Sequence, residues 1–280
     1  MTDDAIGLPP DWPHGLALAQ VATRQRMVLV AGLPGVGKSL LLKQLARLAH
    51  QAGRRVFLLQ WDVARRAFET EAILARYPEV DGFTHAAIKR AAGLWARMAV
   101  LEWHRSHSSA TDLLLGETPL VGGRLIELAD VHGDAAEPLL SSVAVRFVLP
   151  VPSREVRAVI EAARERSIAA PAHERERADA PPNVLRALWE DVYREGHAAG
   201  LVPAPPAMGP VPYDPDAYRA VYTSWLRHRH VTVVEMDRLL PTTGSVYDVE
   251  TVAGELTPTP EEVEQVMRVI DAGTEEDTGP

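Results

Sequence analysis

Residues 32–39 have the composition and spacing of a loop that binds the phosphates of a nucleoside triphosphate. They read Gly-Leu-Pro-Gly-Val-Gly-Lys-Ser and fit the pattern Gly-x-x-x-x-Gly-Lys-Ser/Thr in full. Glycines let consecutive backbone N–H groups point at phosphate oxygens, and the N-terminus of a following helix adds partial positive charge. We expect Lys38 to contact the β- and γ-phosphates and the Ser39 hydroxyl to bind Mg²⁺. The predicted nucleotide-binding residues are Gly32, Leu33, Pro34, Gly35, Val36, Gly37, Lys38, Ser39 and Leu40.

Two carboxylates follow apolar, β-rich runs of the chain. Asp62 follows the run over residues 55–60, and Glu117 follows the run that begins at Asp112. Because ligands bind beyond the carboxyl ends of the strands in a parallel sheet, both carboxylates are expected near the phosphate loop. Asp62 could accept a proton from an acceptor hydroxyl, and Glu117 could bind Mg²⁺ through water, beside Ser39, or position a nucleophile. The sequence leaves open which of the two acts as the base.

Two arginines follow Asp62 within one helical turn. Arg65 and Arg66 could clamp an anionic group, so the predicted substrate-binding residues are Asp62, Arg65 and Arg66. The alternative is an aspartate that caps a helix beside solvated arginines, which is a common arrangement.

An arginine-rich segment follows the fourth β-rich run. Arg154, Arg157, Glu161 and Arg164 repeat at a spacing of three and four residues, so they share one face of a helix. One interpretation is a solvated face with Arg–Glu pairs. The other is a mobile lid whose arginines close over the transferred phosphoryl group. We predict that at least one arginine of this segment acts in catalysis, the candidates being Arg157, Arg164, Arg166, Arg175 and Arg177.

Five apolar, β-rich runs alternate with helical patterns and predict the strands that must position these side chains. They cover residues 27–31, 55–60, 112–115, 144–150 and 231–235. Such alternation is typical of an α/β fold with a parallel sheet and helices on both faces. The first crossover helix is marked by leucines at helical spacing, Leu41, Leu45 and Leu48.

The segments between and after these strands complete a single predicted domain over residues 1–280. Residues 62–110 predict helices that bind an acceptor, broken near residues 78–82. Residues 151–230 predict a lid insertion with a stiff, proline-rich segment at 202–215. Thr259, Pro260 and Glu262 predict the start of a helix. The acidic residues 271–280 predict a disordered tail.

Composition limits the classes of protein to consider. The chain has 280 residues, no cysteine and a net charge of −9. Disulfides and thiol catalysis are therefore excluded, and a role in coating nucleic acid is disfavoured because phosphate backbones bind basic surfaces. No signal peptide and no membrane-spanning run is visible, which predicts a cytoplasmic protein without membrane contact. A homodimer is compatible with the sequence, which does not define the oligomeric state.

Together these features resemble the P-loop small-molecule and nucleotide kinases, a group that includes nucleoside monophosphate, adenylylsulfate, shikimate and gluconate kinases and chloramphenicol phosphotransferase. Asp62-Val-Ala-Arg65 is similar to the Asp-x-x-Arg after the second strand of adenylylsulfate kinase, where it contacts the acceptor. The resemblance implies a five-stranded sheet in the order 2-3-1-4-5, with ATP and Mg²⁺ as cofactors and a lid over the nucleotide. Two features depart from the group: the length of the insertion, and the Gly-Glu-Thr-Pro motif of the third strand.

Several functions share a phosphate loop, and the sequence ranks them. Phosphoryl transfer from Mg·ATP to a small acceptor is the leading prediction. A regulatory GTPase would need an Asn/Thr-Lys-x-Asp segment after a strand, which this chain does not have. An assembly ATPase or a nucleotide-binding switch would turn over or bind nucleotide without an acceptor, and it remains the alternative.

Overall fold

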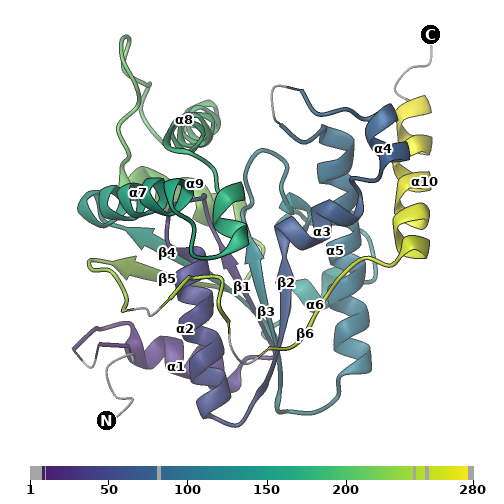
Figure 1. The fold of residues 1–280 in the computed structure, drawn as a ribbon, viewed down its shortest axis with the longest axis horizontal. Coiled ribbons are helices and arrows are strands. Elements are labelled where there is room, and N and C mark those ends of the chain that lie inside the picture. Colours follow the sequence, from purple (N-terminus) through teal and green to yellow (C-terminus); the bar gives the residue numbers. More distant parts are fainter. Residues whose placement is uncertain (1–7, 10, 81–82, 242–243, 250–251, 277–280) are drawn as a thin grey trace.

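A six-stranded parallel sheet forms the centre of the computed structural model (Figure 1), which describes residues 8–9, 11–80, 83–241, 244–249 and 252–276. Its strands lie in the order β5-β4-β1-β3-β2-β6, and every neighbouring pair is parallel. Their bounds are β1 Met27–Ala31, β2 Arg55–Gln60, β3 Asp112–Thr118, β4 Val145–Pro152, β5 Val231–Met236 and β6 Val252–Glu255. The predicted α/β class with a parallel sheet is therefore confirmed.

The prediction of five strands in the order 2-3-1-4-5 was wrong, because β6 adds a sixth strand beyond β2. The order that includes it reads 6-2-3-1-4-5. β6 contains Gly254 and is only four residues long, so its sequence has little strand character. The β2–β6 register also shifts between Val56 and Phe57. The third strand was predicted too short, since β3 continues through Glu117 to Thr118.

Helices cover both faces of the sheet, and alternate strand residues point to opposite faces. On one face α1 Gly15–Arg24 and α2 Lys38–Gln51 bury leucines against residues such as Val28 and Val30. On the other face Leu29 and Phe147 belong to the core that α5 Ala86–Ser106 and α9 Pro215–Trp225 complete. The crossover predicted from the leucine spacing is α2, in which Leu41 and Leu45 are fully buried. Helix α1 was not predicted.

Three helices, rather than the predicted two, connect β2 to β3. α3 Trp61–Ala67 begins directly at the end of β2, and α4 Glu71–Arg76 and α5 follow. Thr70 caps α4, since its Oγ1 accepts a hydrogen bond of 3.4 Å from the Ile73 N–H. After β3, the short elements η2 Ile126–Leu128 and α6 Glu137–Leu140 lead to β4.

The insertion between β4 and β5 is helical apart from its proline-rich loop. It contains α7 Arg154–Ala169, the single turn η3 Glu174–Ala178, α8 Pro182–Ala198 and α9. Residues 199–214 lack regular structure and project between α8 and α9 (Figure 1). Ser153 caps α7 by accepting a 3.2 Å hydrogen bond from Val156 N–H, which fixes where the arginine-rich helix begins.

The last element that the structure describes is α10 Pro260–Glu276, which packs against α5. Its predicted start is confirmed by a reciprocal capping box: the Glu262 N–H donates to Thr259 Oγ1 at 3.2 Å, and the Thr259 N–H donates to Glu262 Oε2 at 2.8 Å. The helix runs to Glu276, so residues 271–276 are not the disordered tail that was predicted. Residues 277–280 of that tail lie outside the described residues.

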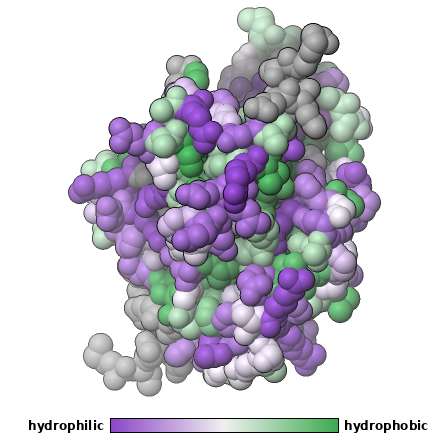
Figure 2. Space-filling view, turned by 90° about the vertical axis from the view of Figure 1, so that its right-hand side faces the viewer, coloured by the Kyte–Doolittle hydropathy of each residue, from purple (hydrophilic) through white to green (hydrophobic). Residues whose placement is uncertain are grey.

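The face that carries α10 is mixed in character (Figure 2), with hydrophilic residues predominating and hydrophobic ones scattered among them. Within the described part of the chain, no helix combines the length and the apolar character needed to span a membrane.

Candidate active site

The phosphate loop joins β1 to α2 and takes a conformation that requires glycine. Gly37 caps α2 with a φ of 89°, in the left-handed region. Gly32 has a φ of 135°, and a Cβ atom there would overlap the Tyr218 hydroxyl of α9. The first glycine of the motif is thus needed both for backbone freedom and because α9 packs directly against the loop.

Lys38, Ser39 and Glu117 form a compact cluster at the carboxyl edge of β1 and β3. Glu117 lies on β3 beside Val30 of β1, next to the loop. Ser39 Oγ lies within hydrogen-bond distance of both Glu117 oxygens, at 3.2 and 3.1 Å. Lys38 Nζ donates to the Leu33 carbonyl at 3.0 Å and lies 3.6 Å from Glu117 Oε1. The structure therefore brings together the two predicted Mg²⁺ ligands and the predicted phosphate-binding lysine.

Burial lowers the pKa of Lys38 to about 8, since the side chain is only 4% exposed and its charge is poorly solvated. The carboxylate of Glu117 acts in the opposite direction, and the positive charge of Arg164 adds to the lowering. Lys38 therefore faces the loop as a cation whose charge is incompletely balanced, which suits an anionic ligand.

Two cavities meet at this cluster. The phosphate-loop cavity, of about 260 Å³, is bordered by Gly35, Gly37 and Ser39. The strand-end cavity, of about 390 Å³, lies at the ends of β2 and β3 and is bordered by Asp62 and Thr84. The residues that line both cavities form their shared wall: Lys38, Glu117, Arg164, Asp179 and Tyr247. A group bound in one cavity would therefore face a group bound in the other.

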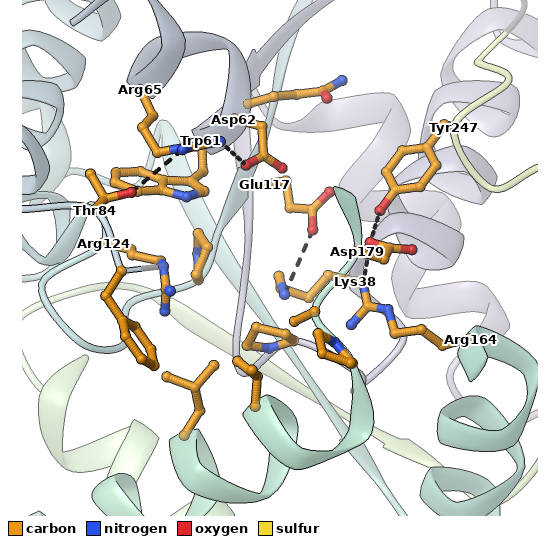
Figure 3. A pocket seen from close by; sticks show the side chains of 18 residues that line it. Lys38, Trp61, Asp62, Arg65, Thr84, Glu117, Arg124, Arg164, Asp179 and Tyr247 are labelled. Carbon is orange, nitrogen blue, oxygen red and sulfur yellow. Dashed lines mark hydrogen bonds and ion pairs between the residues drawn. The ribbon is translucent and has the colours of Figure 1, made fainter. Parts of the chain in front are cut away.

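Of the arginines predicted to act from a lid, Arg164 of α7 reaches this wall (Figure 3). Its Nη2 lies 2.7 Å from Asp179 Oδ1, which also accepts a 2.5 Å hydrogen bond from the Tyr247 hydroxyl. Its Nη1 is buried and has no partner among the described residues. Asp179 and Tyr247 also help to raise the pKa of Arg164, against the effect of its burial, so its positive charge is secure.

The other predicted lid arginines lie elsewhere. The Arg157 guanidinium lies over the Tyr213 ring, 4.4 Å from its centroid, and its Nε is 2.7 Å from Glu161 Oε1. Arg166 and Arg177 are exposed, and Arg175 bonds to Gln60 at the end of β2. None of these four arginines lines either described cavity. Arg157 thus packs against the base of α9 instead of facing the shared wall.

Asp62 and Arg65 border the strand-end cavity, as predicted for substrate-binding residues, whereas Arg66 is exposed and does not line it. The Asp62 side chain is 58% exposed and lies 3.7 Å from Arg65 Nη2. Arg65 is more firmly engaged with Glu69, because its Nη1 is 2.5 Å from Glu69 Oε1. Asp62 therefore remains available to a ligand, while Arg65 already has an anionic partner.

Three residues of the site were not predicted: Arg124 in the strand-end cavity, and Asp179 and Tyr247 in the shared wall. Arg124 follows two glycines in the loop after β3, and a basic residue at that edge of a parallel sheet is a signal that could have been used. Tyr247 follows β5 and Asp179 ends η3. Asp179 belongs to the insertion and Tyr247 to the segment after β5, so only the tertiary fold brings these two next to Arg164.

The residues present fit Mg²⁺ and a nucleotide. Across the described residues there is no group of three or more His, Asp or Glu side chains that could hold a metal by themselves. Ser39 and Glu117 supply two oxygen ligands, which suits an ion that takes its remaining ligands from phosphates and water. Apolar side chains on the far side of the phosphate-loop cavity could hold a flat base: Ile160, Leu239, Leu240 and Val246.

Comparison with known proteins adds little. A scan against models of protein families finds no match, and a search of curated proteins finds none either. Among solved structures, one similar chain is shikimate kinase from Acinetobacter baumannii in complex with shikimate, with a TM-score of 0.25 and 9% sequence identity. The alignment covers 93% of this chain and 99% of that one. At this TM-score, no property of that kinase can be carried over to this chain.

Proposed function

We propose that this protein transfers the terminal phosphoryl group of Mg·ATP to a hydroxyl group of a small acceptor. The observation that carries the proposal is the pair of cavities with a shared wall of Lys38, Glu117 and Arg164. The nucleotide occupies the phosphate-loop cavity and the acceptor occupies the strand-end cavity. The transferred group then lies at the wall, where positive side chains from the loop and from the lid face it.

Each residue of the shared wall has its own role in the proposed transfer. Ser39 and Glu117 would hold Mg²⁺, which would neutralise charge on the phosphates when bound. The acceptor oxygen forms a bond to the γ-phosphorus, the bond between that phosphorus and the bridging oxygen of ADP breaks, and the hydroxyl proton passes to a carboxylate. Lys38 and Arg164 stabilise the negative charge that moves onto the leaving ADP.

Asp62 is the better candidate for the carboxylate that takes the proton. Glu117 is engaged by Ser39, at 3.1 and 3.2 Å, and by Lys38, at 3.6 Å, so it is committed to the loop and would be the residue that holds Mg²⁺ there. Asp62 is exposed to the strand-end cavity, and its nearest cation, Arg65, is 3.7 Å away. A general base must come within hydrogen-bond distance of the acceptor hydroxyl, directly or through one water, and Asp62 borders the acceptor cavity from the first turn of α3.

Acceptor-dependent ATP consumption tests the proposal. Turnover of ATP is measured alone and with nucleosides, nucleotides, sugars and hydroxylated acids, with the phosphorylated product identified by mass spectrometry. We expect little turnover without an acceptor and a large stimulation by at least one compound class. Rapid turnover that no acceptor stimulates would show an ATPase or a switch, and the kinase proposal would then be wrong.

The affinity for Mg·ATP is expected to fall about tenfold between pH 7 and pH 9. Lys38 has a pKa of about 8, so it is protonated in the free protein at pH 7 and mostly neutral at pH 9. Bound phosphates favour the protonated lysine, and binding above pH 8 must therefore take up a proton. Titration calorimetry in two buffers of different ionisation enthalpy measures both the affinity and the proton uptake.

The control for this pH profile is Lys38→Arg, because an arginine stays charged across the whole range. Its affinity for Mg·ATP should change much less between pH 7 and pH 9. An equal loss of affinity in both proteins would assign the titration to another group.

A further inference from the structure

The loop after β3 holds Arg124 in a fixed position at the strand-end cavity. Leu120 and Leu125 flank it with φ values of 49° and 55°, a left-handed conformation that disfavours residues with side chains. Both leucines are fully buried, so packing enforces this strained backbone. Tyr222 of α9 donates a 3.0 Å hydrogen bond to the Pro119 carbonyl, and Lys89 of α5 donates one of 2.8 Å to the Gly122 carbonyl. Packing and these hydrogen bonds therefore fix the backbone of the loop that carries Arg124, which directly precedes Leu125.

Arg124 is also the cation of this cavity that lacks an anionic partner. The other three cations lie near carboxylates: Lys38 near Glu117, Arg65 near Glu69 and Asp62, and Arg164 near Asp179. Arg124 forms no hydrogen bond or ion pair with any residue that the structure describes. Burial lowers its pKa, and Arg65 adds to that effect while Asp62 opposes it. Arg124 is half-buried at the edge of the cavity, so a bound anion could pair with its guanidinium group.

We propose that the strand-end cavity binds an acceptor that carries an anionic group, a carboxylate or a phosphate monoester, and that Arg124 pairs with that group. Figure 3 shows Arg124 pointing into the cavity from one side, with Asp62, Glu117 and Lys38 across from it. The acceptor would place its anion at Arg124 and its hydroxyl near Asp62. Phe83, Val184 and Leu188 line the cavity and would contact its carbon skeleton. A cavity of about 390 Å³ suits a small metabolite.

The role of the hydroxyl rests on the proposed phosphoryl transfer, but anion binding at Arg124 does not. Anion binding can therefore be tested without a known acceptor. The probes are D-glycerate, glycerol 3-phosphate and neutral glycerol, which share a three-carbon skeleton. The assays are calorimetry and thermal unfolding, with saturating Mg·AMP-PNP present so that the phosphate loop is filled.

We expect at least one of the two anions to bind and to raise the Tm, while glycerol at the same concentration does neither. In Arg124→Met the affinity for that anion should fall about tenfold or more, because a charged hydrogen-bonded pair is lost. Arg124→Lys should retain part of that affinity.

The two probes also distinguish the chemical class of the acceptor. A response to glycerate alone assigns a carboxylate acceptor, and a response to glycerol 3-phosphate alone assigns a phosphate monoester.

The matched control is Arg105→Met, which removes an exposed arginine at the far end of α5. It should bind the anions as the unchanged protein does. Equal anion binding in the Arg124→Met and Arg105→Met variants, or no anion binding at all, would overturn the proposal.

Failure of the proposed function has a different signature: it appears as ATP turnover that no acceptor stimulates, or as no binding of Mg·AMP-PNP at all. If Mg·AMP-PNP does not bind, the anion titrations are repeated in Lys38→Met without nucleotide, so that the phosphate loop does not compete for the probes. Anion binding that depends on Arg124 under these conditions would support the anion subsite independently of phosphoryl transfer.

Discussion

Replacing Lys38 with methionine is expected to lower the kcat of acceptor phosphorylation by about 10³-fold or more. The buried ammonium group, 4% exposed and 3.6 Å from Glu117, is the cation of the loop closest to the predicted metal site. Because its charge is poorly solvated, its attraction to phosphate oxygens is screened less than it would be in water and is therefore stronger. Steady-state kinetics with the identified acceptor measure kcat, and calorimetry measures the loss of affinity for Mg·ATP.

The thermal stability of Lys38→Met separates this effect from unfolding. Methionine has a similar length and no charge, and burial of a lysine charge is unfavourable, as the lowering of its pKa to about 8 shows. The variant loses the 3.0 Å hydrogen bond to the Leu33 carbonyl, which offsets part of that gain. We therefore expect a Tm equal to or above that of the unchanged protein. A stable variant with undiminished turnover would contradict the assignment of the loop as the phosphate site.

Local patterns carried most of what could be predicted about the fold. The phosphate loop and α2 follow from a short glycine pattern and leucine spacing, both of which act within a few residues of the chain. β6 was missed because a four-residue strand with a glycine has almost no pattern of its own. It pairs at the edge of the sheet with β2, from which it is separated by nearly two hundred residues, a contact that local patterns do not encode.

The residues of the candidate site show the same difference between local patterns, which could be predicted, and long-range contacts, which could not. Asp62 and Glu117 could be placed near the loop because parallel strands end at one edge of the sheet. The roles of the arginines could not be predicted in this way. Helical spacing placed Arg157 and Arg164 on one face of α7, but in the structure Arg164 pairs with Asp179 and Arg157 lies over the Tyr213 ring. These two partners come from η3 and from the proline-rich loop, and neither periodicity nor composition indicates where those segments fold.

Asp62→Asn is expected to lower kcat by about 10²- to 10⁴-fold while the affinity for Mg·ATP stays unchanged. Asparagine has nearly the same shape but cannot take the proton of the acceptor hydroxyl. Asp62 lines the strand-end cavity and does not border the phosphate-loop cavity, so nucleotide binding should not depend on it. Single-turnover measurements with saturating acceptor isolate the chemical step. If Asp62 only held the acceptor, KM would rise and kcat would be preserved.

Glu79→Gln provides the matched control, because Glu79 is another carboxylate near Arg65, with Oε1 3.9 Å from Nη1, at nearly the same separation as Asp62. It is 46% exposed and does not line the strand-end cavity, so its substitution removes a similar charge from the same arginine without altering the cavity. Only the loss of a base predicts that Asp62→Asn is far slower than Glu79→Gln. Equal rates in the two variants would indicate that Glu117, and not Asp62, is the base, and that Asp62 only pairs with Arg65. In that case Glu117 would have to act as the base while Ser39 and Lys38 hold it, which would make Glu117→Gln the slowest of the carboxylate variants.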